Sequence, residues 1–293
     1  MRYIVGYTDT PAGHDALALA VRLARTNGAQ LDLVLVLASE QRPTIVPADP
    51  GYEKYLLDTA EGWLADARAR VPADVATQPH VVYAESLTDG LNQAADDLGA
   101  ELIVIGAARG GILGRFAIGS AANALLHSAS VPVALAPDGC RALEGSPALS
   151  RITCAVGTRA GADELLTAGI RAARSGGIPL RLISLVALDL PPDERLAQAL
   201  RRAETHARAV LEQAVAHLPD DLTVTTEVVI GDVIEHAVAT VDWDPAEIVL
   251  IGSSRLAQPK HLFLGSTAAK MLRELPVPLV VVPRDSGPTI GDL

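Results

Sequence analysis

The feature that most constrains this chain is an internal repeat as long as a whole domain. Gly106 recurs as Gly252, 146 residues later, and two further landmarks recur with the same offset. A constant offset of this length indicates two duplicated domains rather than a solenoid of small units. Near the start of the halves, Asp15 matches Asp163 at an offset of 148, so small loop differences lie between. The further landmarks are Gly119-Ser120 with Gly265-Ser266, and Val131-Pro132-Val133 with Val277-Pro278-Leu279.

The length and composition agree with two packed domains. The chain has 293 residues, of which 49% are hydrophobic and 20% charged, a composition typical of globular proteins. For this length, two cores of about 145 residues each are the expected organisation. Turn-forming and charged residues gather in segment 138–147, between the last strand-like run of the first half and the first of the second. We therefore predict one domain over residues 1–140 and another over residues 148–293.

Apolar runs and helical stretches alternate in both halves. The runs are continuous, as expected for strands buried on both faces. Their order predicts an α/β fold with two tandem, open, five-stranded parallel sheets that carry helices on both faces. The predicted strands are 3–7, 31–38, 80–83, 102–105 and 131–136, then 152–156, 180–188, 223–230, 248–251 and 279–282. The clearest predicted helices are 15–26, 52–70, 87–98, 120–128 and 193–218.

Charge and hydropathy exclude several kinds of partner. The formal net charge is −11, so the field of the protein opposes nonspecific binding to nucleic acid or to an anionic membrane. No stretch reaches the roughly 18 apolar residues that a membrane helix needs. The first strand-like run begins at Tyr3, which leaves no room for a secretory signal. We therefore expect a cytoplasmic protein with neither nucleic acid nor membrane as a partner.

Neither a metal centre nor a catalytic group emerges from the residue types. The two cysteines are too few for a disulfide framework or a zinc site. We expect Cys154, inside an apolar run, to be a buried small hydrophobe and Cys140, in a polar segment, to be a surface thiol. The seven histidines include no pair at ligand spacing with a carboxylate partner. Nothing in the sequence nominates a nucleophile with its base.

The loop after the fourth strand of each half has the chemistry of an anion site. It begins at Gly106 or Gly252 and ends in Gly-Ser at the start of a helix. In an open parallel sheet, ligands bind beyond the carboxyl ends of the strands. A helix that begins with Gly-Ser presents unpaired amides and the positive end of its dipole, which suit a phosphate. Gly-Ser is also simply a favourable helix start, so the loop alone leaves the structural and the phosphate-binding interpretations equally open.

The motifs GSAANALLHSASVPVALAP from Gly119 and GSTAAKMLRELPVPLVVVP from Gly265 resemble the universal stress protein family. The resemblance covers nearly the whole chain, twice. It implies Rossmann-like domains of the adenine nucleotide alpha hydrolase type, related by a pseudo-two-fold axis through antiparallel pairing of their last strands. It also implies a role in stress response and binding of ATP with Mg²⁺, with the first half as the better candidate. Further assembly into a homodimer is left open. The residues that it nominates for the nucleotide sites are Thr8, Val36, Gly106, Arg109, Gly110, Gly119, Ser120, Ala121, Val156, Leu185, Gly252, Arg255, Gly265, Ser266 and Thr267.

Two departures from the family pattern bear on nucleotide binding. The second glycine of the family's phosphate loop is replaced by Arg109 in the first half and by Arg255 in the second. These arginines either grip a phosphate through a charged fork or fill the pocket in place of the nucleotide. The aspartate that faces the nucleoside in ATP-binding members is replaced by Thr8 in the first half and by Val156 in the second. Losing that contact costs on the order of 1–3 kcal/mol.

Three functional interpretations remain open at this stage. The leading one is a tandem regulatory or sensing module with altered nucleotide pockets, which acts through unidentified protein partners. The second is an ATP- or AMP-binding switch with little turnover, which needs only differential affinity between two conformations. The third is a slow ATPase, which would also need a positioned water, a base and Mg²⁺ ligands.

Overall fold

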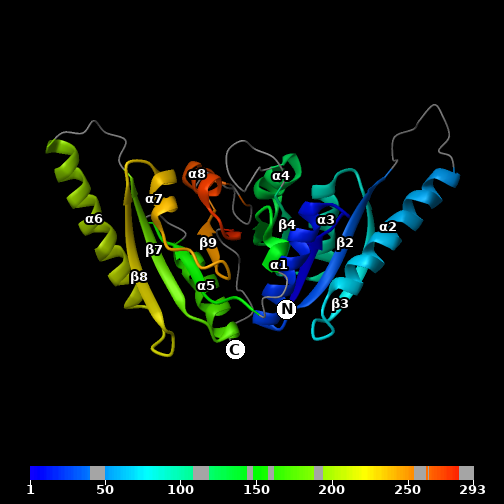
Figure 1. Cartoon of the computed structure of the whole chain (residues 1–293), viewed down its shortest axis with the longest axis horizontal. Helices are drawn as coiled ribbons and strands as arrows, with labels where there is room; N and C mark the ends of the chain where they lie inside the picture. Colours follow the sequence, from blue (N-terminus) through cyan, green and yellow to red (C-terminus); the bar gives the residue numbers. More distant parts are fainter. Residues whose placement is uncertain are drawn as a thin grey trace.

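One continuous ten-stranded sheet runs through the molecule in the strand order β3-β2-β1-β4-β5-β10-β9-β6-β7-β8 (Figure 1). The computed structural model describes residues 1–39, 50–107, 119–143, 148–157, 162–187, 194–253, 262 and 264–283. Within these ranges, the order of strands and helices predicted from the sequence is confirmed in both halves. None of the helices in the described ranges combines the length and apolarity needed to cross a membrane.

The bounds of the elements follow the predicted ones closely. In the first half they are β1 (Arg2–Gly6), α1 (Pro11–Asn27), β2 (Gln30–Ala38), α2 (Pro50–Arg70), β3 (Thr77–Ala84), α3 (Leu87–Leu98), β4 (Leu102–Gly106), α4 (Ser120–Ser128) and β5 (Val133–Ala136). The one-turn 3-10 helix η1 (Cys140–Leu143) follows. In the second half they are β6 (Ile152–Ala155), α5 (Ala162–Gly176), β7 (Leu180–Ala187), α6 (Glu194–Val215), β8 (Val224–Gly231), α7 (Ile234–Thr240), β9 (Ile248–Gly252), α8 (Ser266–Glu274) and β10 (Leu279–Val282).

Local capping chemistry sets the ends of the best-defined helices. The Thr10 side chain accepts a hydrogen bond from the Gly13 amide, and Pro11 occupies the first turn, so α1 begins four residues before its predicted start. Gly28 ends the same helix in the left-handed conformation, with φ 66°. Ser86 and Gly99 provide the same two signals for α3, whose bounds match the prediction.

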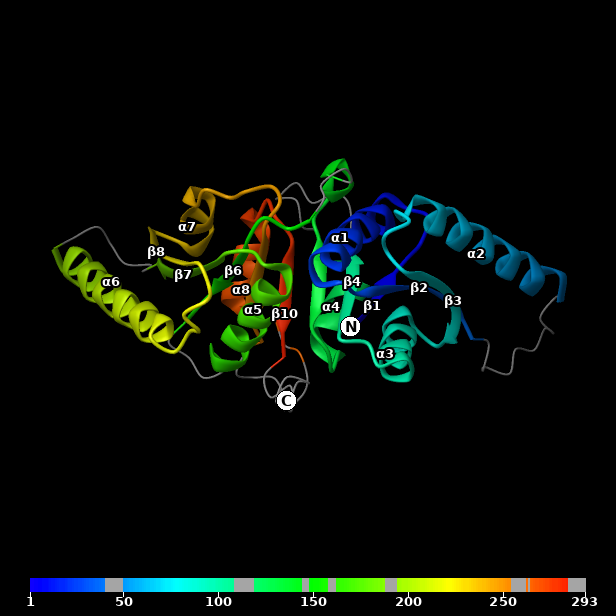
Figure 2. The ribbon, with the colours of Figure 1, turned by 90° about the horizontal axis from the view of Figure 1, so that it is seen from below.

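The two half-sheets meet through their last strands. Within each half all strand pairs are parallel, whereas β5 and β10 pair antiparallel, with Val133 opposite Val281 and Leu135 opposite Leu279. This confirms the pseudo-two-fold pairing implied by the family resemblance. Figure 2 shows β10 at the centre of the molecule, with α2 and α6 at its far ends.

Two hydrophobic layers, one on each face of the sheet, cross this seam. The first packs α1, α2, α5 and α6 against the sheet, and the second packs α3, α4, α7 and α8. Leu262, in the long loop of the second half, is part of the second layer together with Leu125 and Leu126 of α4. Its amide donates to the Ala129 carbonyl at the end of α4 (3.2 Å). The phosphate-type loop of one half thus contacts the corresponding helix of the other.

The segment that joins the halves folds back onto α1. Asp15, only 1% exposed, accepts hydrogen bonds from the amides of Gly139 and Arg141 and from the Arg141 guanidinium. This packing buries Cys140 to 4% exposure, so the expectation of a surface thiol was wrong. The polar composition of the segment suggested solvent, but its turn lies against a helix. Cys154 is fully buried, as expected.

Truncation at the seam tests its contribution. Val281→Ala removes two buried methyl groups from the strand pair, and we expect it to cost about 2 kcal/mol of unfolding free energy in urea titrations. Val215→Ala, at the exposed end of α6, is the matched control and should change stability by less than about 0.5 kcal/mol. Equal effects of the two variants would contradict the packing described.

Candidate functional site

The topology places a crevice at the same point in each half. β1 lies beside β4, and the chain leaves β1 toward the outer edge through α1 but leaves β4 toward the seam through α4. The two helices lie on opposite faces of the sheet. Such a switch point, at the carboxyl ends of the strands, is where open α/β sheets bind ligands. The neighbours β6 and β9 form the equivalent point in the second half.

Gly106 is held in this crevice by close backbone packing. A Cβ atom at this position would fall on the carbonyl group of Ala12, in the first turn of α1. A Cβ at Gly13 would likewise fall on the carbonyl of Thr8. The ends of β1 and β4 therefore lie directly against the start of α1. The packing alone therefore requires glycine at position 106, whether or not a ligand binds nearby.

Among the described residues, no side chain caps the N-termini of α4 and α8. Both begin after a glycine in extended backbone, Gly119 with φ −64° and Gly265 with φ −70°, and glycine has no side chain with which to cap the first turn. Ser120, Ser266 and Thr267 follow and are exposed. Ala121 lies in the same first turn of α4. The first-turn amides and the helix dipole are therefore available to an anion.

At the end of β1, the Thr8 hydroxyl is already engaged. It lies 3.1 Å from the Thr10 hydroxyl, the group that caps α1. The next residue, Asp9, is also engaged locally, because its Oδ1 lies 2.9 Å from His14 Nε2. Thus no carboxylate occupies position 8, and the nearest one is already paired.

The strand register corrects the position assigned in the second half. The Val156 amide donates to the Ile183 carbonyl just as the Tyr7 amide donates to Val34, so Val156 is the counterpart of Tyr7. Both side chains are buried in the first hydrophobic layer. The counterpart of Thr8 is therefore Gly157, one residue later than the sequence alignment indicated. Equivalent strand residues of the two halves are 149 positions apart, whereas Asp15 and Asp163 in the following helices are 148 apart. This difference explains the error of one residue in the predicted position.

The remaining nominated residues fall into two groups. Val36 and Leu185 are half-buried and pack into the second layer, and a Cβ at Gly90 in α3 would collide with Val36. Gly252 ends β9, as Gly106 ends β4. Arg109, Gly110 and Arg255 lie outside the described residues. In the described part of the chain, no group of three or more His, Cys, Asp or Glu side chains could hold a metal ion.

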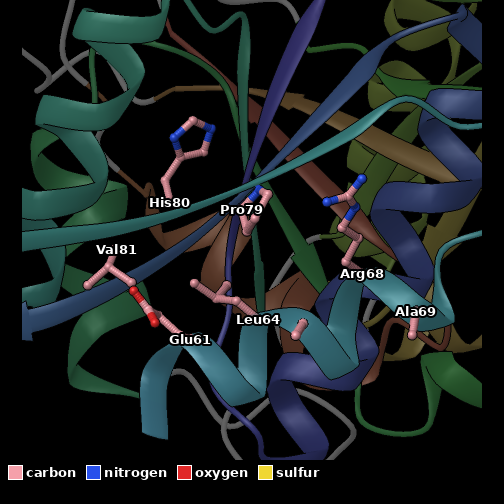
Figure 3. Close-up of a pocket in the computed structure, with 8 residues that line it drawn as sticks. Glu61, Leu64, Arg68, Ala69, Pro79, His80 and Val81 are labelled. Carbon is pink, nitrogen blue, oxygen red and sulfur yellow. The ribbon is translucent and has the colours of Figure 1, made fainter. Parts of the chain in front are cut away.

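A groove of about 730 Å³ lies elsewhere, between α2 and the edge strand β3 (Figure 3). Leu64, Pro79 and Val81 supply its apolar lining, and Glu61 and Arg68 are its charged members on α2. Pro79 suits an edge strand because it lacks the N–H that would otherwise invite another strand. The groove lies two strands away from the switch point and does not belong to the candidate site.

Sequence reasoning missed two buried charge clusters on the inner strands. In the first half, Asp32 accepts hydrogen bonds from Arg2 (2.9 and 2.8 Å) and lies 2.9 Å from His80 Nε2. Burial by itself would raise the pKa of Asp32, but the hydrogen bonds from Arg2 and His80 outweigh it and hold the pKa below its usual value. No local signal in the sequence marks this cluster, because its members come from three different strands.

The second half carries the opposite charge at the same place. Arg181 pairs with Thr153 in the sheet as Asp32 pairs with Ile4, so the two charged residues are equivalent. The Arg181 guanidinium donates to Glu247 (2.9 Å) and stacks on Trp243, 5.0 Å from the ring centre. The clusters lie toward the amino ends of the strands, away from the candidate site, so we assign them to strand pairing.

A duplicated, doubly wound α/β domain with a free helix N-terminus at each switch point defines the class of this protein. The model of the universal stress protein family matches residues 1–137 and 149–283. The chain belongs to the universal stress protein family.

Relatives and solved structures agree with this assignment over the whole chain. Universal stress proteins of Mycobacterium tuberculosis and Mycobacterium bovis are each 29% identical over 293 residues, covering 97% of this chain and 100% of the relative. The crystal structure of a universal stress protein from Archaeoglobus fulgidus covers 97% of this chain and 98% of its own, with a TM-score of 0.68 and 17% identity. A putative universal stress protein from Pseudomonas aeruginosa covers 97% and 93%, with a TM-score of 0.56 and 17% identity. At these identities the two structures establish the shared fold.

Gly106→Ala tests the close packing at the switch point. The new methyl group would collide with backbone rather than with a flexible side chain, so we expect a loss of about 1–3 kcal/mol in urea unfolding. Gly62→Ala, in α2, is the matched control: its Cβ would meet nothing within 4 Å, and it should stabilise by up to about 1 kcal/mol. A neutral Gly106→Ala would show that the crevice is open at this point.

Asp32→Asn tests the buried cluster through pH. Because the folded pKa of Asp32 is lowered, its contribution is complete above the ordinary aspartate pKa of about 3.9 and is lost as pH falls through the lower folded pKa. We expect the variant to lose about 1–2 kcal/mol at pH 7 and to converge with wild type between about pH 4 and pH 2. Asp74→Asn, which breaks an exposed pair with Arg25, is the control and should have a much smaller effect. A difference from wild type that does not change with pH would contradict the charged cluster.

Proposed function

We propose that this protein is a cytoplasmic stress-response regulatory module that acts through contacts with other proteins, and that neither of its nucleotide pockets binds ATP tightly. The observation that carries the proposal is the nucleoside-facing position. The family resemblance implies an aspartate there, whereas the two halves have Thr8, whose hydroxyl lies against Thr10, and Gly157, which has no side chain. Both sites thus lack the charged acceptor.

The magnitude of this loss supports weak binding. A hydrogen bond to a charged group contributes about 1.5–3 kcal/mol, which corresponds to roughly ten- to more than hundred-fold in affinity. The second half loses both the charge and any hydrogen-bonding group at this position. An affinity of about 10 μM would therefore fall to between about 0.1 and 1 mM.

The fused architecture supports a role in protein contacts. Because β5 and β10 belong to one chain, the paired arrangement does not depend on protein concentration. A partner would always meet the same composite surface, built from two halves that differ in their charged residues. The net charge of −11 favours a basic protein partner over nucleic acid.

A second candidate is an ATP- or AMP-binding switch in the first half. The free first turn of α4, with exposed Ser120, favours it, because these amides could still hold a phosphate. The opposite end of α4 contacts Leu262 of the second half, so an anion that orders α4 would also affect the second half through this contact. Such a switch needs differential affinity between two states and no hydrolysis.

Calorimetric titration of ATP with Mg²⁺ into ligand-stripped protein, preceded by mass spectrometry of any small molecule released on denaturation, separates the two candidates. We expect no co-purified nucleotide and a Kd no tighter than about 0.1 mM. Thr8→Asp should then tighten binding at least about tenfold, because it restores the charged acceptor, whereas Thr8→Asn, the matched neutral control, should not. Micromolar binding by wild type, or co-purified adenine nucleotide, would replace the proposal with the switch.

The loop arginines are tested by the same titration in the Thr8→Asp background. Arg109→Gly restores the glycine of the family pattern in the first half, and Arg255→Gly does so in the second. If the arginine fills the pocket, its removal raises affinity, as the main proposal requires. If it grips phosphate, affinity falls, as the switch requires.

A further inference from the structure

Arg22 is a buried cation whose charge nothing in the described structure neutralises. It lies in the middle of α1 with 0% of its surface exposed. Among the described residues, none of its three guanidinium nitrogens has a hydrogen-bond partner of regular geometry. An uncompensated buried charge is strongly destabilising, so its retention calls for a partner. Asp15, on the same helix, already accepts three hydrogen bonds from the connecting segment.

The position of Arg22 under the connecting segment identifies the group it faces. Asp15, Arg22 and Thr26 are spaced by seven and four residues and so lie along one stripe of α1. Asp15 holds the start of the segment, and the Thr26 hydroxyl accepts from the Leu149 amide near its end (2.9 Å). Arg22 lies between these two anchors, and the described side chain that it approaches there is Cys140, at the start of η1.

In its reduced form, Cys140 does not supply the missing charge. Burial raises the pKa of its thiol to about 11; the Arg22 guanidinium acts to lower it, and nearby Asp15 to raise it. At neutral pH the sulfur is therefore a neutral thiol, and Arg22 stays without a counter-charge. An oxyanion built on the same sulfur would meet N–H donors that are already buried and unsatisfied.

We propose that Cys140 is a site of oxidation by peroxides, and that its sulfinate form is held by Arg22. In the first step the Cys140 thiol loses its proton as the sulfur attacks a peroxide oxygen: an S–O bond forms, the O–O bond breaks, and the other oxygen takes up the proton that the thiol lost and leaves as water or alcohol. The sulfur loses two electrons and the peroxide gains them, which gives the sulfenic acid. A second peroxide molecule repeats the step to the sulfinic acid, which loses its proton at neutral pH. The inference does not rest on the proposed nucleotide sites.

The other cysteine is an internal control. Cys154 is 0% exposed, and burial alone raises the pKa of its thiol to about 12. It lies in β6, a strand paired on both sides, with β7 and β9. Cys140 instead lies in a single 3-10 turn at a chain connection, where local opening costs less than unfolding the sheet. Oxidation is therefore expected at Cys140 rather than at Cys154, because Cys140 lies near Arg22 and its turn opens more readily.

The modification would act on the joint between the halves. The sulfinate would tie η1 to α1 by a charged contact, in addition to the Asp15 and Thr26 anchors. We expect the oxidised protein to be more stable than the reduced protein, the reverse of the usual effect of adding a charge to a buried site.

Peroxide treatment of the full chain tests the site directly. Mass spectrometry should find two added oxygen atoms on Cys140 while Cys154 stays reduced, and the thermal midpoint should rise by about 4 °C. In Arg22→Met the same oxidation should lower the midpoint. Equal oxidation of both cysteines, a disulfide between them, or a lower midpoint in oxidised wild type would overturn the proposal.

A pair of isosteric variants tests the charge without an oxidant. Cys140→Asp places a carboxylate where the sulfinate would lie, and Cys140→Asn has the same shape without the charge. With Arg22 present, the aspartate variant should melt about 4 °C above the asparagine variant at pH 7, despite the nearby Asp15. An aspartate variant that melts below the asparagine variant would show that Arg22 does not stabilise an anion at this position, whether or not Arg22→Met folds.

Discussion

The antiparallel pairing of β5 with β10 is the contact on which the rest of the structure depends. Each strand is apolar on both faces, so either half alone would end in a strand that invites aggregation. Within one chain the two strands cover each other, and both hydrophobic layers continue across the seam. The seam also brings Leu262, which precedes α8 in the second half, to Ala129 at the end of α4 in the first half.

The two halves retain one backbone plan but differ in their polar residues. Asp32 and Arg181 occupy the same position with opposite charge, and each is compensated by partners from neighbouring strands. Thr8 and Gly157 are the equivalent pair at the candidate site, where a hydroxyl side chain in one half corresponds to no side chain in the other. A buried charge can be exchanged only together with its partners, whereas a residue at an open strand end can change alone. The site is therefore free to diverge while the fold stays fixed.

Much of the fold could be predicted from the sequence because its signals are local or periodic. The 146-residue repeat, the continuous apolar runs and the Val-Pro-Val-type last strands are sufficient for two half-sheets and their pairing. Features that depend on contacts between segments distant in the sequence could not be predicted. The burial of Cys140 and the position of Arg22 arise because residues 138–143 and Leu149 pack along α1, and the register of Val156 is set by its pairing with a neighbouring strand. The nominated residues Arg109, Gly110 and Arg255 remain predictions.

If the seam joins the two halves into one cooperative unit, both halves must unfold together, and the two tryptophans can report on each half. Trp63 lies on α2 in the first half, and Trp243 packs beside Arg181 in the second. Each can be isolated by changing the other to phenylalanine. Urea unfolding followed by fluorescence would then report on each half separately. We expect the two transitions to coincide in midpoint and slope. Two separated transitions, with one half unfolding while the other stays native, would contradict it.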